Sequence, residues 1–263
     1  MGSVIEHGVC RLALVSVRAD EQPSTEQTSQ LLFGDHYEVM QFSKDRRMTR
    51  IRIHADQFEG WIDTRQHHLI SPEYFDQISN SDYRITTDIA SPVLFRKVPL
   101  TIVMGSIVPF SNSELFKVEE QFAFNGESKS LGQRRDFEFL ASIAKKYQLA
   151  PELAGGKSPF GLDAAAFIQM VFRISGYPLQ REVKLLAGQG KKVKSFADAK
   201  PGDIAFFAGP QGEVNHAGLI LEEDKVIHVY GHVRQDRLTE EGILNHETKV
   251  YSHLVHSIRR LLP

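Results

Sequence analysis

The pattern of apolar residues changes character once along this chain, close to residue 133. Up to that point the apolar runs are short, rich in β-branched and aromatic residues, and separated by turn formers such as Gly34 and Asp35. This pattern is typical of short strands. Beyond it, apolar residues recur at helical spacing over residues 137–147 and 163–174, and strand-like runs return from residue 204. The sequence therefore predicts an all-β first half followed by an α+β domain.

The first half divides into two β segments, residues 1–70 and 71–128. In the first segment Ile51 and Ile53 alternate with arginines, which predicts a strand with one buried face and one face in water. Trp61, the only tryptophan, is expected in the core. Two successive segments of this kind predict a pair of small β-barrels.

The second segment is expected to break at Pro99, Gly105 and Pro109 and to end in a strand within LFKVEEQFAF, residues 115–124. Residues 126–133, GESKSLGQ, are small and polar and predict a linker. The linker would separate the β segments from the second half of the chain.

The overall composition excludes several classes of protein. The chain has 263 residues, a formal net charge of -2 at pH 7 and a single cysteine, Cys10. A lone thiol excludes an intrachain disulfide and a zinc site built on several cysteines. Nucleic acid is an unfavourable partner because its recognition relies on a basic face. No apolar run reaches the about 18 residues of a spanning helix and no signal peptide is visible, so we expect a cytoplasmic protein without a membrane span.

The second half predicts two helices and then antiparallel strands. The first helix covers residues 137–147, and the second begins near Asp163 and is stopped by Gly176 and Pro178. The strands that follow read IAFFA, HAGLILEED and KVIHVYG, the last two joined by an acidic turn. This order of elements predicts an α+β domain.

Residues 155–182, GGKSPFGLDAAAFIQMVFRISGYPLQRE, resemble the NlpC-type family of bacterial cell-wall cysteine peptidases, a branch of the papain-like proteins. The later family motifs are found here in the same order as PGDIAFF, NHAGLIL and VIHVYG, and VRQDRLTEEGI also fits. Members of this architecture, similar to γ-D-glutamyl-diamino-acid endopeptidases, carry bacterial SH3-like domains in front. The resemblance implies SH3-like barrels at residues 1–70 and 71–128 and a papain-like domain at residues 129–263.

The resemblance also implies a chemistry. In the family, a thiol at the first turn of a helix lies at the positive end of the macrodipole, which favours the thiolate. By correspondence, position 164 is that of the nucleophile, His216 is the base that transfers the proton, and His228 orients His216. The implied substrate is a short peptidoglycan stem peptide cut after γ-D-glutamate, and the family implies no cofactor and no metal.

Position 164, however, is alanine. Ala165 and Ala166 stand where the family has Ser and Gly, while Tyr230 and Gln180 replace Ser and Pro. A methyl group cannot attack a carbonyl, and loss of the nucleophile from a comparable triad costs roughly a factor of a million in rate. Several neighbouring departures favour natural divergence over an engineered change of the nucleophile alone.

Four residues are candidate contacts for a bound peptide: Asp163, Ala165, Tyr230 and Glu59. Asp163 can cap the helix, contact the amino end of the ligand, or do both. Glu59 either holds an ammonium group or is an exposed loop carboxylate. Tyr230 is expected to fill the space beside Ala164 that the missing sulfur leaves.

Alternatives remain for the other candidates. His216 and His228 are either relics of a triad or ordinary strand histidines, and a metal set of these two with His232 is weak because no matched carboxylate pattern accompanies it. Cys10, in a predicted barrel strand, and Ser158, in a turn, are poor substitute nucleophiles. Two further family positions are expected in structural ion pairs: Arg181 and Arg234.

Three functions are compatible with the sequence. The favoured one is an inactive peptidase homologue that binds a murein stem peptide or a protein partner in the remnant groove. The second is an active cell-wall peptide hydrolase with an unrecognised nucleophile, or a Cys-to-Ala variant of one. The third is a pure interaction module with a filled groove; the sequence leaves the oligomeric state open.

Overall fold

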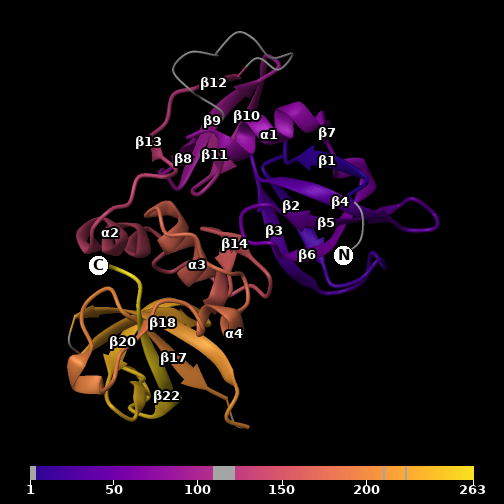
Figure 1. Ribbon diagram of the computed structural model, residues 1–263. Helices are drawn as coiled ribbons and strands as arrows, with labels where there is room; N and C mark the ends of the chain where they lie inside the picture. The colour runs from indigo at the N-terminus through magenta and orange to yellow at the C-terminus, as the bar shows by residue number, and fades with distance from the viewer. Residues whose placement is uncertain (1–3, 109–121, 210, 223) are drawn as a thin grey trace. The chain divides into compact units, whose positions relative to one another are not determined.

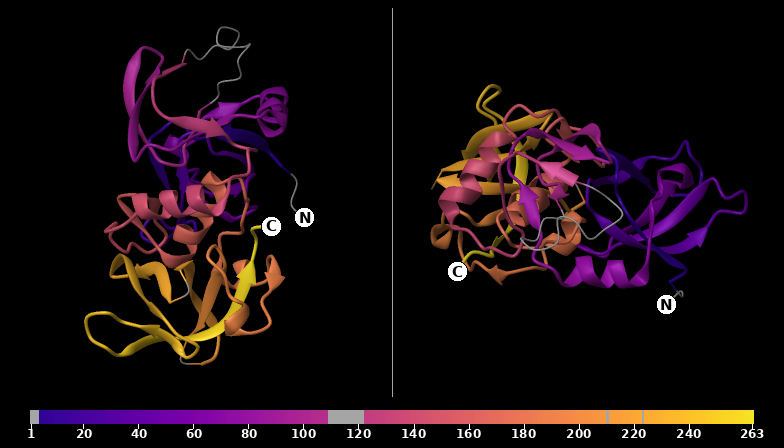
Figure 2. Two further views of the ribbon diagram at one scale, coloured as in Figure 1. Left: turned by 90° about the vertical axis from the view of Figure 1, so that its left-hand side faces the viewer. Right: turned by 90° about the horizontal axis from the view of Figure 1, so that it is seen from above.

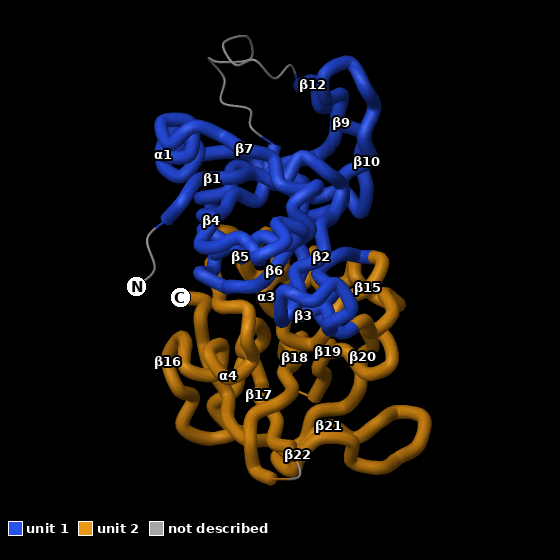
Figure 3. Tube along the Cα trace, turned by 90° about the vertical axis from the view of Figure 1, so that its right-hand side faces the viewer, with its two compact units in different colours: residues 1–133, 154–159 blue, residues 134–153, 160–263 orange. Residues whose placement is uncertain are grey.

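The computed structural model describes residues 4–108, 122–209, 211–222 and 224–263 (Figures 1 and 2). The chain divides into two compact units (Figure 3). Unit 1 comprises residues 1–133 and 154–159, and unit 2 comprises residues 134–153 and 160–263. The boundary after residue 133 coincides with the change in apolar spacing. The structure is mixed, with mostly antiparallel sheets and a few helices.

The first part of unit 1 is one antiparallel sheet with the strand order β3-β2-β6-β5-β4-β1-β7. In chain order its strands are Glu6–Val9, Leu14–Arg18, Gln27–Leu32, His36–Phe42, Met48–Ile53, Glu59–Asp63 and Leu69–Ile70. Ile51 and Ile53 are fully buried and Arg50 is exposed, as the alternation predicts. Trp61 is only half-buried, so the expectation of a core tryptophan is wrong. The inward positions of β6 are taken by Gly60 and Ile62.

Helix α1 (Pro72–Asn80) follows this sheet, where the sequence analysis expected only strands. The side chain of Ser71 accepts a hydrogen bond from the Tyr74 N–H, and Pro72 lies in the first turn, where its fixed φ suits a helix. Phe75 and Ile78 are buried in the adjoining core. The Ser-Pro start was therefore a local helix signal that the strand pattern obscured.

The rest of unit 1 contains two small antiparallel sheets, β10-β9-β12 and β11-β8-β13. The strands of these two sheets are β8 (Arg84–Thr86), β9 (Ala90–Phe95), β10 (Val98–Val103), β11 (Ile107–Val108), β12 (Phe122–Phe124) and β13 (Ser128–Ser130). Strand β14 (Lys157–Ser158) belongs to neither sheet. The expected break at Pro99 is wrong. Pro99 lies inside β10, an outer strand of its sheet, where a residue without an N–H is tolerated. The chain turns instead at Arg96 and Lys97, while Gly105 breaks the strands as expected.

Two other expectations fall in this region. Pro109 and most of the strand expected within residues 115–124 lie outside the described residues, and β12 is the part that is described. The linker expected at residues 126–133 is not free of secondary structure, because β13 pairs with β8. A strand of small polar residues can form there because backbone hydrogen bonds, not side chains, hold the ladder.

Unit 2 begins with the helices that the spacing predicts. They are α2 (Phe137–Lys146), α3 (Ala164–Ile174) and the short α4 (Val183–Leu186); single 3-10 turns lie at η1 (Thr64–Gln66) in unit 1 and η2 (Phe196–Asp198) in unit 2. Asp136 caps α2 through the Phe139 N–H, and Gly176 follows α3 with a φ of 89° that ends the helix. In the part of the chain that the structure describes, no helix combines the length and the apolar character needed to cross a bilayer.

The sheet of unit 2 has the order β16-β22-β17-β18-β19-β20-β21, and β21 also pairs with β22, so that β17 to β22 close into a barrel. The strands of unit 2 are β15 (Gly161–Leu162), β16 (Lys191–Lys192), β17 (Ile204–Ala208), β18 (Val214–Glu222), β19 (Lys225–Tyr230), β20 (His232–Leu238), β21 (Gly242–Leu244) and β22 (Tyr251–Arg260). The predicted strands IAFFA, HAGLILEED and KVIHVYG are confirmed as β17, β18 and β19. Helices α2 and α3 lie together on one side of the barrel, and α3 packs against β18 and β19 (Figures 1 and 2).

Candidate functional site

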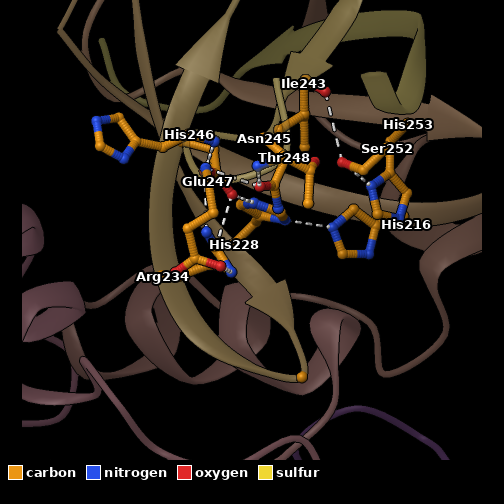
Figure 4. A network of polar contacts seen from close by, with 12 residues as sticks. His216, His228, Arg234, Ile243, Asn245, His246, Glu247, Thr248, Ser252 and His253 are labelled. Carbon is orange, nitrogen blue, oxygen red and sulfur yellow. Dashed lines mark hydrogen bonds and ion pairs between the residues drawn. The ribbon is translucent and has the colours of Figure 1, made fainter. Parts of the chain in front are cut away.

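Three neighbouring strands of the barrel bring His216, His228 and Asp236 into one hydrogen-bonded row, and Figure 4 shows the two histidines. Nε2 of His216 lies 2.9 Å from Nδ1 of His228, and Nε2 of His228 lies 3.1 Å from Oδ2 of Asp236. The three side chains come from β18, β19 and β20, which are adjacent in the sheet. The structure thus joins the two histidines that the sequence analysis selected and adds a carboxylate that it did not.

Burial and hydrogen bonding set the protonation of this row. Burial lowers the pKa of His216 well below its usual value, and the nearby His253 and His228 add to this effect. Burial alone would raise the pKa of Asp236, but hydrogen bonds from His228 and from the His246 N–H hold it below its usual value. At neutral pH the row therefore contains a neutral His216 and an ionised Asp236.

A third histidine, His253, completes the cluster and was missed by the sequence analysis. Its ring stacks on that of His216 with centroids 4.0 Å apart and an interplanar angle of 18°. Nδ1 of His253 lies 2.9 Å from Oγ of Ser252, and burial lowers the pKa of His253 to about 4. No sequence motif marks β22, and the pairing of β22 with β17 joins residues distant in the chain. Only the fold reveals this contact.

Position 164 lies at the N-terminus of α3, where Ala164 is 9% exposed. Oδ1 of Asp163 accepts a hydrogen bond of 2.8 Å from the Ala166 N–H, so the expected capping role is confirmed. The same carboxylate binds Arg181 at 2.5 and 3.1 Å, which confirms an ion pair for that arginine. Both oxygens of Asp163 are therefore engaged within the unit.

The other candidates have ordinary surroundings. Arg234 is confirmed in an ion pair, 2.8 Å from Asp236. Glu59 lies on β6 of unit 1, not in a loop, and its carboxylate is 2.7 Å from Arg50. Tyr230 is 47% exposed and meets His253 edge-on with centroids 5.4 Å apart, and its expected place beside Ala164 stays a prediction.

The remaining thiol and hydroxyl candidates belong to unit 1. Cys10 is buried in the core of the first sheet and its Sγ lies 3.3 Å from the Leu12 carbonyl. Burial raises the pKa of this thiol to about 12. Ser158 is buried on β14.

The last candidate, Ala165, lies in unit 2. It is half-buried at the first turn of α3.

Comparison with known proteins assigns a family to the part of the chain that carries these side chains. Residues 151–252 match the NlpC/P60 family. The segment contains position 164, His216, His228 and Asp236, whereas His253 lies one residue beyond it. Residues 151–252 form an NlpC/P60 family domain.

Two curated proteins are similar in sequence to part of the chain. The γ-D-glutamyl-L-lysine dipeptidyl-peptidase of Bacillus subtilis is 38% identical over 80 residues, which is 30% of this chain and 27% of that protein. Dipeptidyl-peptidase 6 of Lysinibacillus sphaericus is 28% identical over 91 residues, 35% of this chain and 31% of that protein. The matched part spans less than a third of the length of each relative.

Solved structures resemble the fold over most of the chain. An NlpC/P60 family protein from Bacillus cereus has a TM-score of 0.80 at 15% identity, covering 98% of this chain and 100% of that one. An NlpC/P60 endopeptidase from Photobacterium damselae has a TM-score of 0.66 at 15% identity, covering 95% of this chain and 66% of that one. At this identity the likeness concerns the fold alone.

Proposed function

We propose that this chain is a catalytically inactive homologue of the NlpC/P60 peptidoglycan hydrolases, and that it binds a peptidoglycan-derived peptide without cutting it. Its segments at residues 1–70 and 71–128 would be SH3-like barrels preceding the NlpC/P60 domain at residues 129–263. The B. subtilis relative is named for action on a γ-D-glutamyl-L-lysine bond, which supports a ligand with an L-Ala-γ-D-Glu-diamino-acid sequence.

The observation that carries the proposal is Ala164 at the N-terminus of α3, in a domain whose His216-His228-Asp236 row is intact. A helix N-terminus next to a neutral imidazole would activate a thiol, because the dipole stabilises the thiolate and the ring accepts the proton. With a methyl group at this position no covalent intermediate can form. The rate expected without a nucleophile is lower by roughly a factor of a million.

In this proposal the ligand contacts side chains that remain accessible in the folded chain. Tyr230 offers a half-exposed ring beside His253, and Ala165 is half-buried at the start of α3. Asp163 is bonded to Arg181 and to the helix, so we assign it a structural role. Glu59, which is paired with Arg50, is a candidate to bind the ligand's ammonium group. A substitution of Glu59 that weakens peptide binding would support this role.

The test of inactivity is incubation with L-Ala-γ-D-Glu-L-Lys and its diaminopimelate analogue, with products followed by mass spectrometry. We expect no turnover above a buffer control, and turnover by the unaltered chain would refute the proposal. Ala164→Cys is expected to restore hydrolysis, because the base and its orienting groups remain. Ala165→Cys, which moves the thiol one residue along the same helix, is the matched control and should stay inactive.

The test of binding is isothermal titration with the same peptides. We expect saturable binding that weakens in Tyr230→Ala and is retained in Tyr251→Ala, a control at another exposed tyrosine of the same barrel. Absence of heat together with absence of a thermal shift would overturn peptide binding. That result would favour a protein-interaction module.

A further inference from the structure

We propose that His216, His228 and His253 form a binding site for a first-row transition-metal ion of the Zn²⁺ class. The three imidazoles project from β18, β19 and β22, and one nitrogen of each lies within 4.8 Å of the others (Figure 4). The cluster contains His253 in place of the His232 considered from the sequence. The proposal goes beyond peptide binding and does not depend on it.

The spacing of these nitrogens suits a metal once the side chains rotate toward a common ion. Zinc–nitrogen bonds of about 2.0 to 2.1 Å in a tetrahedral site place the ligand nitrogens about 3.4 Å apart. Nε2 of His216 and Nδ1 of His228, 2.9 Å apart, must separate slightly, and the ligand nitrogens of the cluster all lie within 4.8 Å of one another. The stacked rings of His216 and His253 must also turn about their side-chain torsions, because a metal ion lies in the plane of each imidazole that binds it.

The surroundings fix the orientation of two rings in the way metal sites require. Asp236 accepts a hydrogen bond from Nε2 of His228, which leaves Nδ1 as the ligand atom. Oγ of Ser252 lies against Nδ1 of His253, which leaves Nε2 free to bind. A carboxylate behind a ligating histidine is a recurrent feature of metal sites, where it holds the ring and raises its basicity.

The donor set defines the class of ion. Imidazole nitrogens suit Zn²⁺, Co²⁺, Ni²⁺ and Cu²⁺, whereas Mg²⁺ and Ca²⁺ select oxygen ligands. Three histidines leave a fourth tetrahedral position for water or for an oxygen of a bound molecule. His216 binds through Nε2 if its proton moves to Nδ1, so the metal would replace the hydrogen bond between His216 and His228.

The experiment is a titration of the full chain, without an affinity tag and treated with a chelator, with Zn²⁺ by calorimetry and with Co²⁺ by visible absorption. We expect one equivalent to bind and tetrahedral Co²⁺ bands to appear. His253→Gln should weaken binding by at least tenfold, and Asp236→Asn by about 10- to 100-fold. His256→Gln, at an exposed histidine of the same strand, is the matched control and should bind as the unaltered chain does.

Each outcome decides the proposal. Binding of one equivalent that weakens at least tenfold in His253→Gln and is kept in His256→Gln supports the site. Absence of saturation, or equal affinity in both variants, overturns it. Circular dichroism of each metal-free variant checks its fold. If His253→Gln unfolds, His216→Gln takes its place with the same expected loss.

Discussion

Nε2 of His228 lies 3.1 Å from the carboxylate of Asp236, and both side chains are fully buried. A carboxylate has no proton to donate, so the ring must carry its proton on Nε2. The same carboxylate binds Arg234 at 2.8 Å and the His246 N–H at 2.7 Å. Asp236 therefore joins strands β19 and β20 to the loop before β22, a structural role that does not require the chemistry of position 164.

We predict that Asp236→Asn destabilises unit 2 by about 3 kcal/mol, because it removes the negative charge that Arg234 pairs with and the carboxylate that accepts the hydrogen bond of His228 in a buried network. Urea unfolding followed by circular dichroism measures this change. The matched control is Asp224→Asn, whose partner Arg237 is 3.8 Å away in a pair exposed by about 60% on both sides. A surface pair of this kind contributes about 0 to 1 kcal/mol. Equal effects of the two substitutions would contradict the structural role of Asp236.

Asp163→Ala should cost more than the loss of a helix cap. Removal of a capping aspartate costs about 1 kcal/mol, but here it also breaks the ion pair with Arg181, whose side chain is 5% exposed, and breaking a buried pair adds about 3 kcal/mol. Asp136→Ala is the matched control, because Asp136 caps α2 through the Phe139 N–H. We expect its cost to be about 1 kcal/mol in the same unfolding experiment. A double substitution that also replaces Arg181 by Met should recover part of the loss.

Much of the fold was predictable because local periodicity reports directly on burial. The alternation around Ile51 and the helical spacing before Ile174 gave elements within a residue or two of those observed. The predictions of secondary structure that were wrong share a cause. Pro99 is accommodated because β10 is an outer strand, and β13 forms because β8 offers a partner. Both facts concern neighbours that are distant in sequence.

The same limit applies to the candidate site. His216 and His228 lie in motifs, so they could be selected from the sequence, and the structure bonds them to one another. His253 follows no motif, and it meets His216 only because β17 pairs with both β18 and β22. A register of this kind is set by the closure of the barrel, which local spacing does not encode.

The turn between β9 and β10 offers a stabilising substitution. Arg96 and Lys97 adopt φ values of 50° and 65°, a conformation that costs L-residues about 1 to 2 kcal/mol each and that Asn-Gly favours in two-residue hairpins. The double variant Arg96→Asn, Lys97→Gly should stabilise unit 1 by about 1 kcal/mol in thermal unfolding. Arg96→Asn with Lys97→Ala is the control, since alanine keeps the Cβ atom. A gain of equal size in the control would contradict the backbone explanation.

Cys10 should be unreactive in the folded protein. Burial raises the pKa of its thiol to about 12, so that the thiolate fraction near pH 8 is roughly a thousandfold below that of an ordinary cysteine. Alkylation by iodoacetamide, followed by mass spectrometry, should be slow in buffer and fast in concentrated urea. Because the chain has one cysteine, the unfolded chain is its own reference. Rapid labelling without urea would show that the core of the first sheet opens readily.

The stability of unit 1 should fall as the pH decreases from about 7 to about 5. Burial lowers the pKa of His54 below its usual 6.5, although Glu38 acts in the opposite direction. The ring stacks on His36 and meets Phe75 edge-on. A depressed pKa in the folded state means that the unfolded chain binds more protons than the folded chain in this pH range. The contribution of His54 to the stability of unit 1 is therefore complete above about pH 6.5 and is lost below it.

Fluorescence of Trp61, the only tryptophan, follows the unfolding of unit 1. The pH slope of its urea midpoint should be smaller in His54→Gln, which cannot take up a proton. His68→Gln, at another histidine of unit 1, is the control for loss of an imidazole as such. Burial also lowers the pKa of His67, so a slope of the same sign should persist in His54→Gln. A midpoint that rises on acidification would refute the assignment.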